Sequence, residues 1–322
     1  MSEEPYLSGW RYWAVILSVV FSALGYLGFS LWGGWHEVSS AIAKVGLLGI
    51  AIALLMSMIN YSLRFLRWQE YLKAFGHVIP WKPSFKIYLA GFALTTTPGK
   101  AGEALRGVLL KPLGVPYPQS FAAFFSERLS DLLAVVLLTL FGLTLYPDAR
   151  TMIVVGVVLV VIGFAMLSQR RLIEFLAHFV PKQGGKLVGF LRHLFNVLLE
   201  AQRCHRPGML LGATVLSVLA WSSEALAFYW ILSWMGADIP LTFAVFVYAI
   251  AMLAGVLSFM PGGLGGAEAV MIALLIWKGM PSADAIAATV LIRLATLWFA
   301  VGIGAIALAD IKNNDSYLRV EK

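Results

Sequence analysis

Long runs of apolar residues constrain the fold of this chain more than any other feature of its sequence. A helix needs about 20 such residues to cross the hydrocarbon of a bilayer, and six segments come close to this length or exceed it: residues 12–31, 42–63, 119–146, 151–168, 208–232 and 284–309. Charged residues account for only 13% of the chain, whereas a soluble domain has about a quarter. The sequence therefore predicts an all-α polytopic membrane protein that forms a single transmembrane domain over residues 1–322.

Two further apolar stretches, 83–112 and 241–278, are interrupted near their middle by proline and glycine. The first contains Thr-Pro-Gly-Lys at 97–100, and the second contains Met-Pro-Gly-Gly at 260–263. Because proline and glycine break helices, each stretch is predicted to form two short helices joined by a turn. Each pair is either a re-entrant hairpin or two full spans, and in both cases it begins and ends on the same side of the membrane.

Basic residues are distributed unequally between the two sides that this span count defines. Nineteen of the 24 Lys and Arg residues fall on the side of both termini and of segments 64–118 and 169–207, and three fall on the other side. The positive-inside rule assigns the basic side to the cytoplasm. Topology thus explains the net charge of +7 without a nucleic acid partner. We expect a bacterial cytoplasmic (inner) membrane protein with both termini in the cytoplasm.

The chain also contains an internal repeat. Matching residues recur first 160 positions apart and later 165 positions apart: Gly76–Pro80 on Gly236–Pro240, Tyr88 on Tyr248, Pro98-Gly99 on Pro261-Gly262, Glu103 on Glu268, Gly114 on Gly279, Pro116 on Pro281 and Arg128 on Arg293. The first copy covers about 42–146 and the second about 208–309, and the basic cytoplasmic segment 169–207 joins them. The span count gives the copies opposite orientations. Inverted repeats with interrupted helices are typical of secondary transporters, whose sites lie between the halves near mid-membrane.

Two arginines lie deep inside predicted spans. Arg128 and Arg293 are each about ten residues from the span end, which is about 15 Å along a helix. An arginine at this depth costs about 2.5–3.5 kcal/mol, so it faces protein, water or a ligand. Arg128 has the counter-ion candidates Glu127 and Asp131 on its own helix, which favours a structural ion pair as one interpretation. Arg293 has no acid within one turn, and guanidinium suits phosphate, so both arginines are candidate substrate-binding residues.

The sequence allows more than one role for three carboxylates, those of Glu103, Glu268 and Glu224. Glu103 and Glu268 follow the two Pro-Gly turns at the start of short helices. Such a carboxylate either caps the helix N-terminus, acts as a counter-ion to a buried arginine, or couples transport to protons. Glu224 lies in the middle of a span, where no cap is needed, and is a functional candidate by its depth. Arg293 must reach Glu268, Glu224 or a ligand.

Glycines cluster at the same two turns, 98–102 and 261–266. They leave backbone N–H groups exposed at the start of a helix, where the dipole favours an anion. The sequence predicts two phosphate-binding turns, and the alternative is that the glycines only allow close helix packing. The candidate residues are Gly99, Lys100 and Gly102 in the first turn and Gly262, Gly263 and Gly265 in the second. Because Lys100 matches Gly263, we expect Gly263→Ala to fold and Gly265→Ala to be worse.

No pattern in the sequence indicates catalysis or metal binding. Cys204 is the only cysteine, which excludes disulfides and multi-cysteine metal sites. The five histidines lack metal-ligand spacing, no Ser-His-Asp set is present, and no polar stretch is long enough for a separate catalytic domain. We therefore expect no enzyme activity, no cofactor and no metal. If segment 169–207 is cytoplasmic, Cys204 should react with an impermeant maleimide only after cells are permeabilised.

Three motifs of this chain resemble those of a known family: Thr97-Pro98-Gly99…Gly102-Glu103, Ser126-Glu127-Arg128 and Pro261-Gly262-Gly263-Leu264-Gly265…Glu268. The chain is similar over about residues 12–309 to the lysylphosphatidylglycerol synthase transmembrane region, or flippase-like, family. Members include the flippase half of enzymes that aminoacylate phosphatidylglycerol and stand-alone proteins linked to hopanoid or polyprenyl-sugar pathways. The resemblance implies that the protein moves a lipid with a modified head group. The 322 residues contain no soluble aminoacyl-transfer domain, so synthase activity is not expected.

These observations lead to one main functional hypothesis and two alternatives. The main hypothesis is a lipid flippase whose substrate is an anionic, phosphate-bearing lipid, either a modified phospholipid or a polyprenyl-phosphate-linked sugar. The first alternative is an ion-coupled transporter of a small solute. The second is a non-catalytic membrane subunit that partners a glycosyltransferase or a lipid-modifying enzyme.

Overall fold

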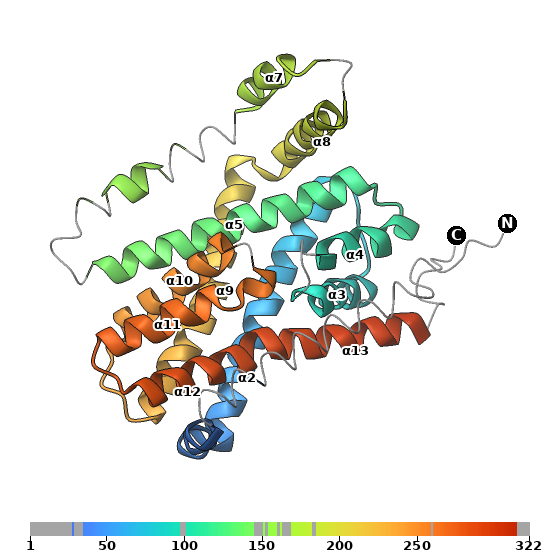
Figure 1. Cartoon of the computed structure of the whole chain (residues 1–322). Helices are drawn as coiled ribbons and strands as arrows, with labels where there is room; N and C mark the ends of the chain where they lie inside the picture. The colour runs from blue at the N-terminus through green and yellow to red at the C-terminus, as the bar shows by residue number, and fades with distance from the viewer. Residues whose placement is uncertain are drawn as a thin grey trace.

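The computed structural model is a bundle of helices (Figure 1). It describes residues 28, 35–96, 101–144, 151, 154–159, 162, 169–181, 185–258 and 260–313, and these contain no strand. The predicted span 12–31, apart from residue 28, and most of the predicted span 151–168 lie outside the described residues. The prediction of an all-helical membrane fold is confirmed for the part of the chain that is described.

The helices of the first half and of the second half follow the same order. The first half contains α2 (Trp35–Ala74), α3 (Trp81–Ala90), the 3₁₀ turn η1 (Gly91–Leu94), α4 (Ala101–Leu110), η3 (Lys111–Leu113) and α5 (Tyr117–Leu143). The second half contains α9 (Pro207–Trp234), α10 (Leu241–Leu257), η6 (Pro261–Gly263), α11 (Gly266–Trp277), α12 (Ser282–Arg293), the π-helical turn η7 (Leu294–Trp298) and α13 (Phe299–Asn313). Each half is thus a long helix, a broken pair of shorter helices and a second long helical segment.

The same turns separate these elements in both halves. Gly76 after α2 and Gly236 after α9 have φ of 90° and 84°, in the left-handed region that favours glycine. The next residue in each case donates its N–H to a carbonyl five positions earlier, at 2.9 Å and 3.0 Å, which closes the helix end. A proline, Pro80 or Pro240, then precedes the next helix. The glycine–proline pattern of the repeat therefore ends one helix and starts another twice in the chain.

Within the described part of the chain, three helical segments are long and apolar enough to cross a membrane: His36–Ala74, Pro207–Trp234 and Ser282–Ile311. They contain three of the six predicted spans. A fourth predicted span, 119–146, forms α5, which has 27 residues but carries three charged residues in its middle. The chain is a multi-pass membrane protein, and six complete spans remain a prediction.

The broken pairs contain helices that are too short to span a bilayer alone. α4 has 10 residues and α11 has 12. At 1.5 Å per residue these helices are about 15 Å and 18 Å long, against a hydrocarbon thickness of about 30 Å. The interruption predicted at 260–263 is present as η6, where Gly262 and Gly263 have φ of 64° and 68°.

The last helical segment of each half packs against the broken pair of the other half. α5 packs on α10, α13 packs on α3 and η1, and α2 crosses α9. Glycines permit the first two crossings: a Cβ at Gly142 of α5 would lie 2.3 Å from the Cβ of Phe246, and a Cβ at Gly304 of α13 would lie 2.4 Å from the N of Ala93. The halves are interlocked and do not form two separate bodies.

Two apolar cores lie on either side of a polar layer. The first core is built mainly from the early part of α2, the late part of α9, α10 and α12, and the second from the late part of α2, α3, η1 and α13. On α5 the buried residues of the second core end at Ala123 and those of the first begin at Val135, and on α9 the gap lies between Ala213 and Ala225. Polar side chains occupy these gaps, so they lie near the middle of the bundle.

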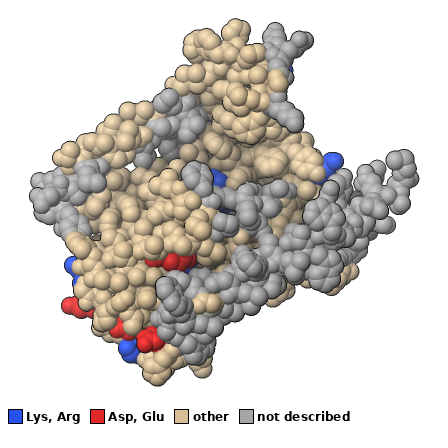
Figure 2. Space-filling model, viewed as in Figure 1, with Lys and Arg blue, Asp and Glu red and all other residues tan. Residues whose placement is uncertain are grey.

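The outside of the bundle is mostly apolar. Most of the described residues in view in Figure 2 are uncharged, and the Lys, Arg, Asp and Glu atoms gather toward the lower left with a few near the middle and at the right. Exposed leucine and isoleucine side chains such as Leu47, Leu48 and Ile306 suit a lipid environment. Between the halves, α8 (Lys186–Ala201) packs on α5, and α7 (Arg170–His178) packs on α8 farther from the bundle (Figure 1).

Candidate functional site

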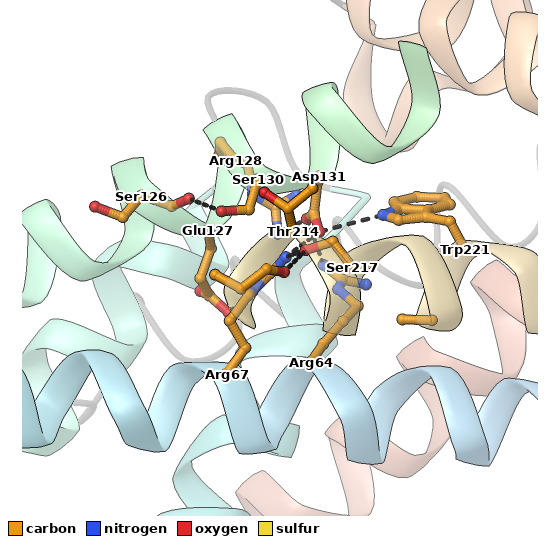
Figure 3. A network of polar contacts seen from close by, with 12 residues as sticks. Arg64, Arg67, Ser126, Glu127, Arg128, Ser130, Asp131, Thr214, Ser217 and Trp221 are labelled. Carbon is orange, nitrogen blue, oxygen red and sulfur yellow. Dashed lines mark hydrogen bonds and ion pairs between the residues drawn. The ribbon is translucent and has the colours of Figure 1, made fainter. Parts of the chain in front are cut away.

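The polar layer contains a network of charged side chains from three helices, and most of these side chains are buried. We call it the arginine network and define it by six residues: Arg64 and Arg67 of α2, Arg106 of α4, and Glu127, Arg128 and Asp131 of α5. Figure 3 shows the side chains of α2 and α5 directed toward one another, with polar side chains of α9 beside them. Each α5 member lies within one helical turn of the others, which places them on neighbouring faces of the helix.

Asp131 is the centre of this network. Its carboxylate accepts hydrogen bonds from Arg67 at 2.8 Å and from Arg64 at 3.2 Å. Arg128, three residues earlier on the same helix, forms an ion pair with it at 3.2 Å. The indole N–H of Trp221 on α9 also donates to it at 3.2 Å. One buried carboxylate thus holds together α2, α5 and α9.

Glu127, the second carboxylate of the network, contacts Arg106 and Arg67. Its side chain is completely buried, accepts a hydrogen bond from Arg106 at 2.8 Å and faces Arg67 at 3.7 Å. The guanidinium of Arg106 also lies over the ring of Tyr88, 4.3 Å from the ring centre, in a cation–π contact. Buried ions need this kind of compensation, because removing them from water costs several kcal/mol each.

The arginine network has more positive than negative groups. Four guanidinium groups face two carboxylates, which leaves a net charge of +2 inside the bundle. The Nε atoms of all four arginines, and one terminal nitrogen of Arg67, are buried without a hydrogen-bond acceptor among the described residues. Since a buried donor without an acceptor is costly, the arrangement is suited to an additional anion.

The ion pair predicted between Arg128 and Asp131 is present, but its setting differs from the prediction. The side chain of Arg128 is 32% exposed, and it shares Asp131 with two arginines from another helix. Glu127, the other predicted partner, binds Arg106 and Arg67 instead. Arg128 is therefore the most exposed arginine of the network.

Three members of the network were not predicted as site residues. Arg64, Arg67 and Arg106 were counted among the nineteen basic residues of the predicted cytoplasmic side, and all three are buried inside the bundle. Without them, the number of basic residues counted on that side is sixteen, against three on the other. A signal was present in the sequence, since the polar residues Asn60, Arg64 and Arg67 recur on one face of a helix that continues to Ala74.

A second cluster of charges surrounds Arg293. Its Nε donates to Glu268 at 2.6 Å and a terminal nitrogen donates to the carbonyl of Gly262 at 2.9 Å. Glu268 also accepts the N–H of Gly265 at 2.7 Å. Two of the roles considered for Glu268, helix cap and counter-ion, are thus combined in one side chain. Of the partners considered for Arg293, the structure places Glu268 in contact.

Two backbone donors of the second glycine turn are used within the chain itself. The N–H of Gly265 binds the chain's own Glu268, and the N–H of Gly263 donates to the carbonyl of Met260 at 2.9 Å. The contacts of an added Cβ differ between the two glycines of the predicted alanine substitutions. A Cβ on Gly263 would lie 3.0 Å from the Cα of Gly255, whereas a Cβ on Gly265 would meet nothing closer than the sulfur of Met260 at 3.5 Å.

The first glycine turn lies mostly outside the described residues. Gly99 and Lys100 are not described, and of Gly102 and Glu103 only the backbone is described, in the first turn of α4. The predicted roles of these four residues therefore remain predictions.

Glu224 lies between the two charged clusters. Its carboxylate accepts a hydrogen bond from the hydroxyl of Tyr248 at 2.6 Å and interacts electrostatically with both Arg64 and Arg293. Arg64 and Glu224 are 160 positions apart in sequence, the spacing that also relates Tyr88 to Tyr248. At this position of the repeat, one half carries a cation and the other an anion.

Comparison with known proteins places these features in a family. A protein of Methanothermobacter thermautotrophicus described as a UPF0104 membrane protein is 26% identical, and the alignment covers 85% of this chain and 89% of that protein. Glycosyltransferase AglD of Haloferax volcanii is 24% identical over 78% of this chain and 47% of its own length. Phosphatidylglycerol lysyltransferase of Staphylococcus xylosus is 32% identical over 81 residues, which are 24% of this chain and 9% of that protein. The family described as lysylphosphatidylglycerol synthase TM region matches residues 15–304, and this chain belongs to it.

Proposed function

We propose that this protein is a lipid flippase that moves an anionic, phosphate-bearing lipid between the two leaflets of the membrane. The substrate is a modified phospholipid or a polyprenyl-phosphate-linked sugar, and the protein acts as a transporter without catalysis. The observation that carries this proposal is the arginine network, with its net charge of +2 and its unpaired N–H groups. A lipid phosphate supplies both the missing negative charge and the missing acceptors.

The chemistry of the network favours phosphate over other anions. Guanidinium presents a planar fork of N–H donors that matches the oxygens of a phosphate group. The network lies between two apolar cores, where a charged head group has to pass when it crosses the hydrocarbon. Arg128 is the member best placed to meet a head group because of its exposure.

The packing of the halves supports an inverted repeat with a pseudo-twofold axis. Asn60 of α2 donates to the carbonyl of Ala220 on α9 at 2.8 Å, and these two positions are equivalent in the repeat, 160 residues apart. Equivalent residues meet in this way where a twofold axis passes between two elements. The exchange of α5 and α13 between the halves follows the same symmetry. On this basis α4 and α11 belong to re-entrant pairs, and the basic loops and termini face the cytoplasm of a bacterial cell.

Two of the similar proteins support a lipid-related role. One is named a phosphatidylglycerol lysyltransferase and the other a glycosyltransferase. In the second case the matched region is 47% of that protein, so a region like this chain occurs beside other sequence. This observation favours, as a second candidate function, a membrane subunit that partners a glycosyltransferase or a lipid-modifying enzyme.

Reconstitution into liposomes distinguishes these functions. The full chain is inserted into vesicles that contain a fluorescent phosphatidylglycerol or, separately, a fluorescent diacylglycerol, and dithionite quenching from outside reports exchange between leaflets. The flippase proposal predicts protein-dependent exchange of the phosphate-bearing lipid, with loss of exchange in Arg128→Gln at normal insertion. The surface variant Arg170→Gln is the control, because Arg170 lies on α7 outside the bundle.

The possible negative results point to the alternatives. No exchange of any lipid by the wild-type protein contradicts the flippase and favours the partner subunit. Proton- or sodium-dependent uptake of a water-soluble solute, without lipid exchange, favours the ion-coupled transporter, in which Glu224 is the coupling residue.

A further inference from the structure

A pocket of about 230 Å³ opens between the end of α2 and the beginning of α9. Its walls are formed by two groups of residues: Arg67, Glu70 and Tyr71 on α2, and Gly208, Met209, Gly212, Ala213 and Leu216 on α9. Gly208 and Gly212 are exposed and one helical turn apart, so they lie on the same face of α9. The pocket thus has a side that is open and lined by small residues.

Arg67 gives this pocket a positively charged wall. Its residue surface is only 1% exposed, yet it lines the pocket. One terminal nitrogen donates to Asp131 and to Ser217, whereas Nε and the other terminal nitrogen lack a hydrogen-bond acceptor in the described part of the chain. Arg67 therefore borders an open pocket with a guanidinium whose Nε has no acceptor among the described residues and whose second terminal nitrogen faces Glu127 at 3.7 Å.

The glycines of the pocket are not required by the packing of the protein. A Cβ added at Gly208 or Gly212 would meet no atom within 4 Å, and neither residue has a positive φ. A glycine inside a helix is about 1 kcal/mol less favourable than alanine. Gly142 and Gly304 allow a close helix contact, but Gly208 and Gly212 do not lie at one. The absence of side chains at Gly208 and Gly212 instead leaves the pocket open.

The surroundings of the pocket indicate which anion fits. Exposed apolar side chains, Leu211, Val215 and Leu219, follow one another along the adjacent face of α9. Acyl chains can lie along this stripe while a phosphate reaches Arg67. The volume is below the range of about 300–1,000 Å³ for sites that hold drug-sized ligands, so the head group has to be small.

We propose that this pocket is the cytoplasmic access site for the phosphate of a phospholipid with a small head group, and that Arg67 binds this phosphate. The inference rests on the proposed flippase function and adds the substrate class and the route by which it reaches the arginine network. A large glycan attached to the phosphate does not fit this pocket.

The test measures binding to the full chain in detergent by calorimetry. The probes are dihexanoyl-phosphatidylglycerol, the neutral dihexanoylglycerol and inorganic phosphate. We expect the wild-type protein to bind the phospholipid, to bind inorganic phosphate more weakly and not to bind the neutral lipid. Gly212→Leu and Gly208→Leu add a side chain whose Cβ meets no atom within 4 Å, and they should weaken phospholipid binding roughly tenfold or more, since a charge-assisted hydrogen bond is lost.

The matched control is Gly302→Leu on α13. Gly302 also has no atom within 4 Å of an added Cβ and is exposed, but it lies away from the pocket. It should bind the phospholipid as the wild type does. Unchanged binding in Gly212→Leu and Gly208→Leu overturns the pocket assignment, and so does an absence of binding to the wild type. Inorganic phosphate that binds as tightly as the phospholipid overturns the assignment to a lipid.

Liposome exchange separates this inference from the proposed function. If the wild type moves phosphatidylglycerol and Gly212→Leu moves it equally well, the pocket is wrong and the flippase function stands. If the wild type binds the phospholipid in a way that Gly212→Leu abolishes but moves no lipid, the pocket stands and the flippase function fails.

Discussion

The two halves of the chain, 35–143 and 207–313, share a succession of helices and turns but differ in the charge that they place in the polar layer. The first half carries four arginines and two carboxylates, with a net charge of +2. The second half carries Arg293 with Glu268 and Glu224, which leaves −1. The comparison shows that the backbone of a repeat can be kept while its charges diverge, so one polar layer acquires a positive and a negative region.

The matched arginines illustrate the same divergence. Arg293 is 4% exposed, and its donors are bound by Glu268 and by the carbonyl of Gly262. Arg128 occupies the equivalent position in the first half, but it is 32% exposed on its side chain and shares Asp131 with Arg64 and Arg67. The same residue type therefore stabilises the fold in one half and is available to a ligand in the other.

The largest effect is expected from removing the carboxylate at the centre of the first-half network. Asp131→Asn leaves Arg64, Arg67 and Arg128 without their shared counter-ion and should destabilise the protein by at least about 3–5 kcal/mol. The measurement is thermal unfolding in detergent. The comparison variant is Glu224→Gln, which keeps the hydrogen bond to Tyr248 and removes no ion pair within 4 Å among the described residues. Equal unfolding temperatures for the two variants would contradict the central role of Asp131.

A second large effect distinguishes Arg293 from Arg128. Arg293→Gln leaves the buried Glu268 without its ion-pair partner and should destabilise the protein by about 3 kcal/mol. Arg128→Gln removes a partly exposed pair and should change stability by less than about 1 kcal/mol, while it reduces lipid exchange. Unfolding and liposome exchange are measured on the same preparations. The assignment fails if Arg128→Gln unfolds easily, or if Arg293→Gln is stable and loses only transport.

Alanine substitutions in the second glycine turn should destabilise the protein less, and by different amounts at Gly263 and Gly265. Gly263→Ala places a Cβ 3.0 Å from the Cα of Gly255 at a φ of 68°, and should cost about 1–3 kcal/mol from overpacking in addition to backbone strain. Gly265→Ala has no such contact, but its φ of 83° and ψ of −55° lie in the strained γ-turn region of positive φ, so a backbone strain of about 1–3 kcal/mol applies. The measurement is the midpoint of unfolding. A more stable Gly263→Ala than Gly265→Ala would mean that α10 and α11 do not pack as described.

The last prediction concerns the reactivity of the Cys204 thiol and involves no change in stability. Cys204 is completely buried in the segment that joins the halves, and burial raises the pKa of its thiol to about 12. The thiol stays protonated at neutral pH, and a maleimide reacts with the thiolate. We therefore expect no labelling in the folded protein and full labelling in dodecyl sulfate. Rapid labelling of the folded protein would contradict the burial.

The burial of Cys204 means that the topology experiment suggested by the sequence, maleimide labelling of Cys204, needs a different cysteine. Cys204 cannot report the side of segment 169–207, because it is inaccessible even in permeabilised cells. The exposed neighbour Arg206 can, as Arg206→Cys in a Cys204→Ser background. Labelling only after permeabilisation is expected if the segment is cytoplasmic.

The sequence by itself determined the helical membrane class, the interruptions of the apolar stretches and the repeated glycine–proline turns. Each of these depends on a few neighbouring residues. Gly76 and Gly236 end helices because a left-handed residue is needed there, and Pro80 and Pro240 precede the next helix for reasons of local geometry. The pairing of Arg128 with Asp131 was predictable for the same reason, since three residues on a helix bring side chains together.

Only the tertiary structure decided which charges meet across the bundle. Arg64 and Arg67 are 67 and 64 residues from Asp131 in sequence, and their contact depends on how α2 and α5 cross. The turn at Gly263 and Gly265 appeared suited to an external anion, but packing of α11 against α12 brings Glu268 and Arg293 together and uses its donors internally. Local geometry is set by short-range sterics and hydrogen bonds, whereas the partner of a buried charge is set by the packing of whole helices, which no single stretch of sequence contains.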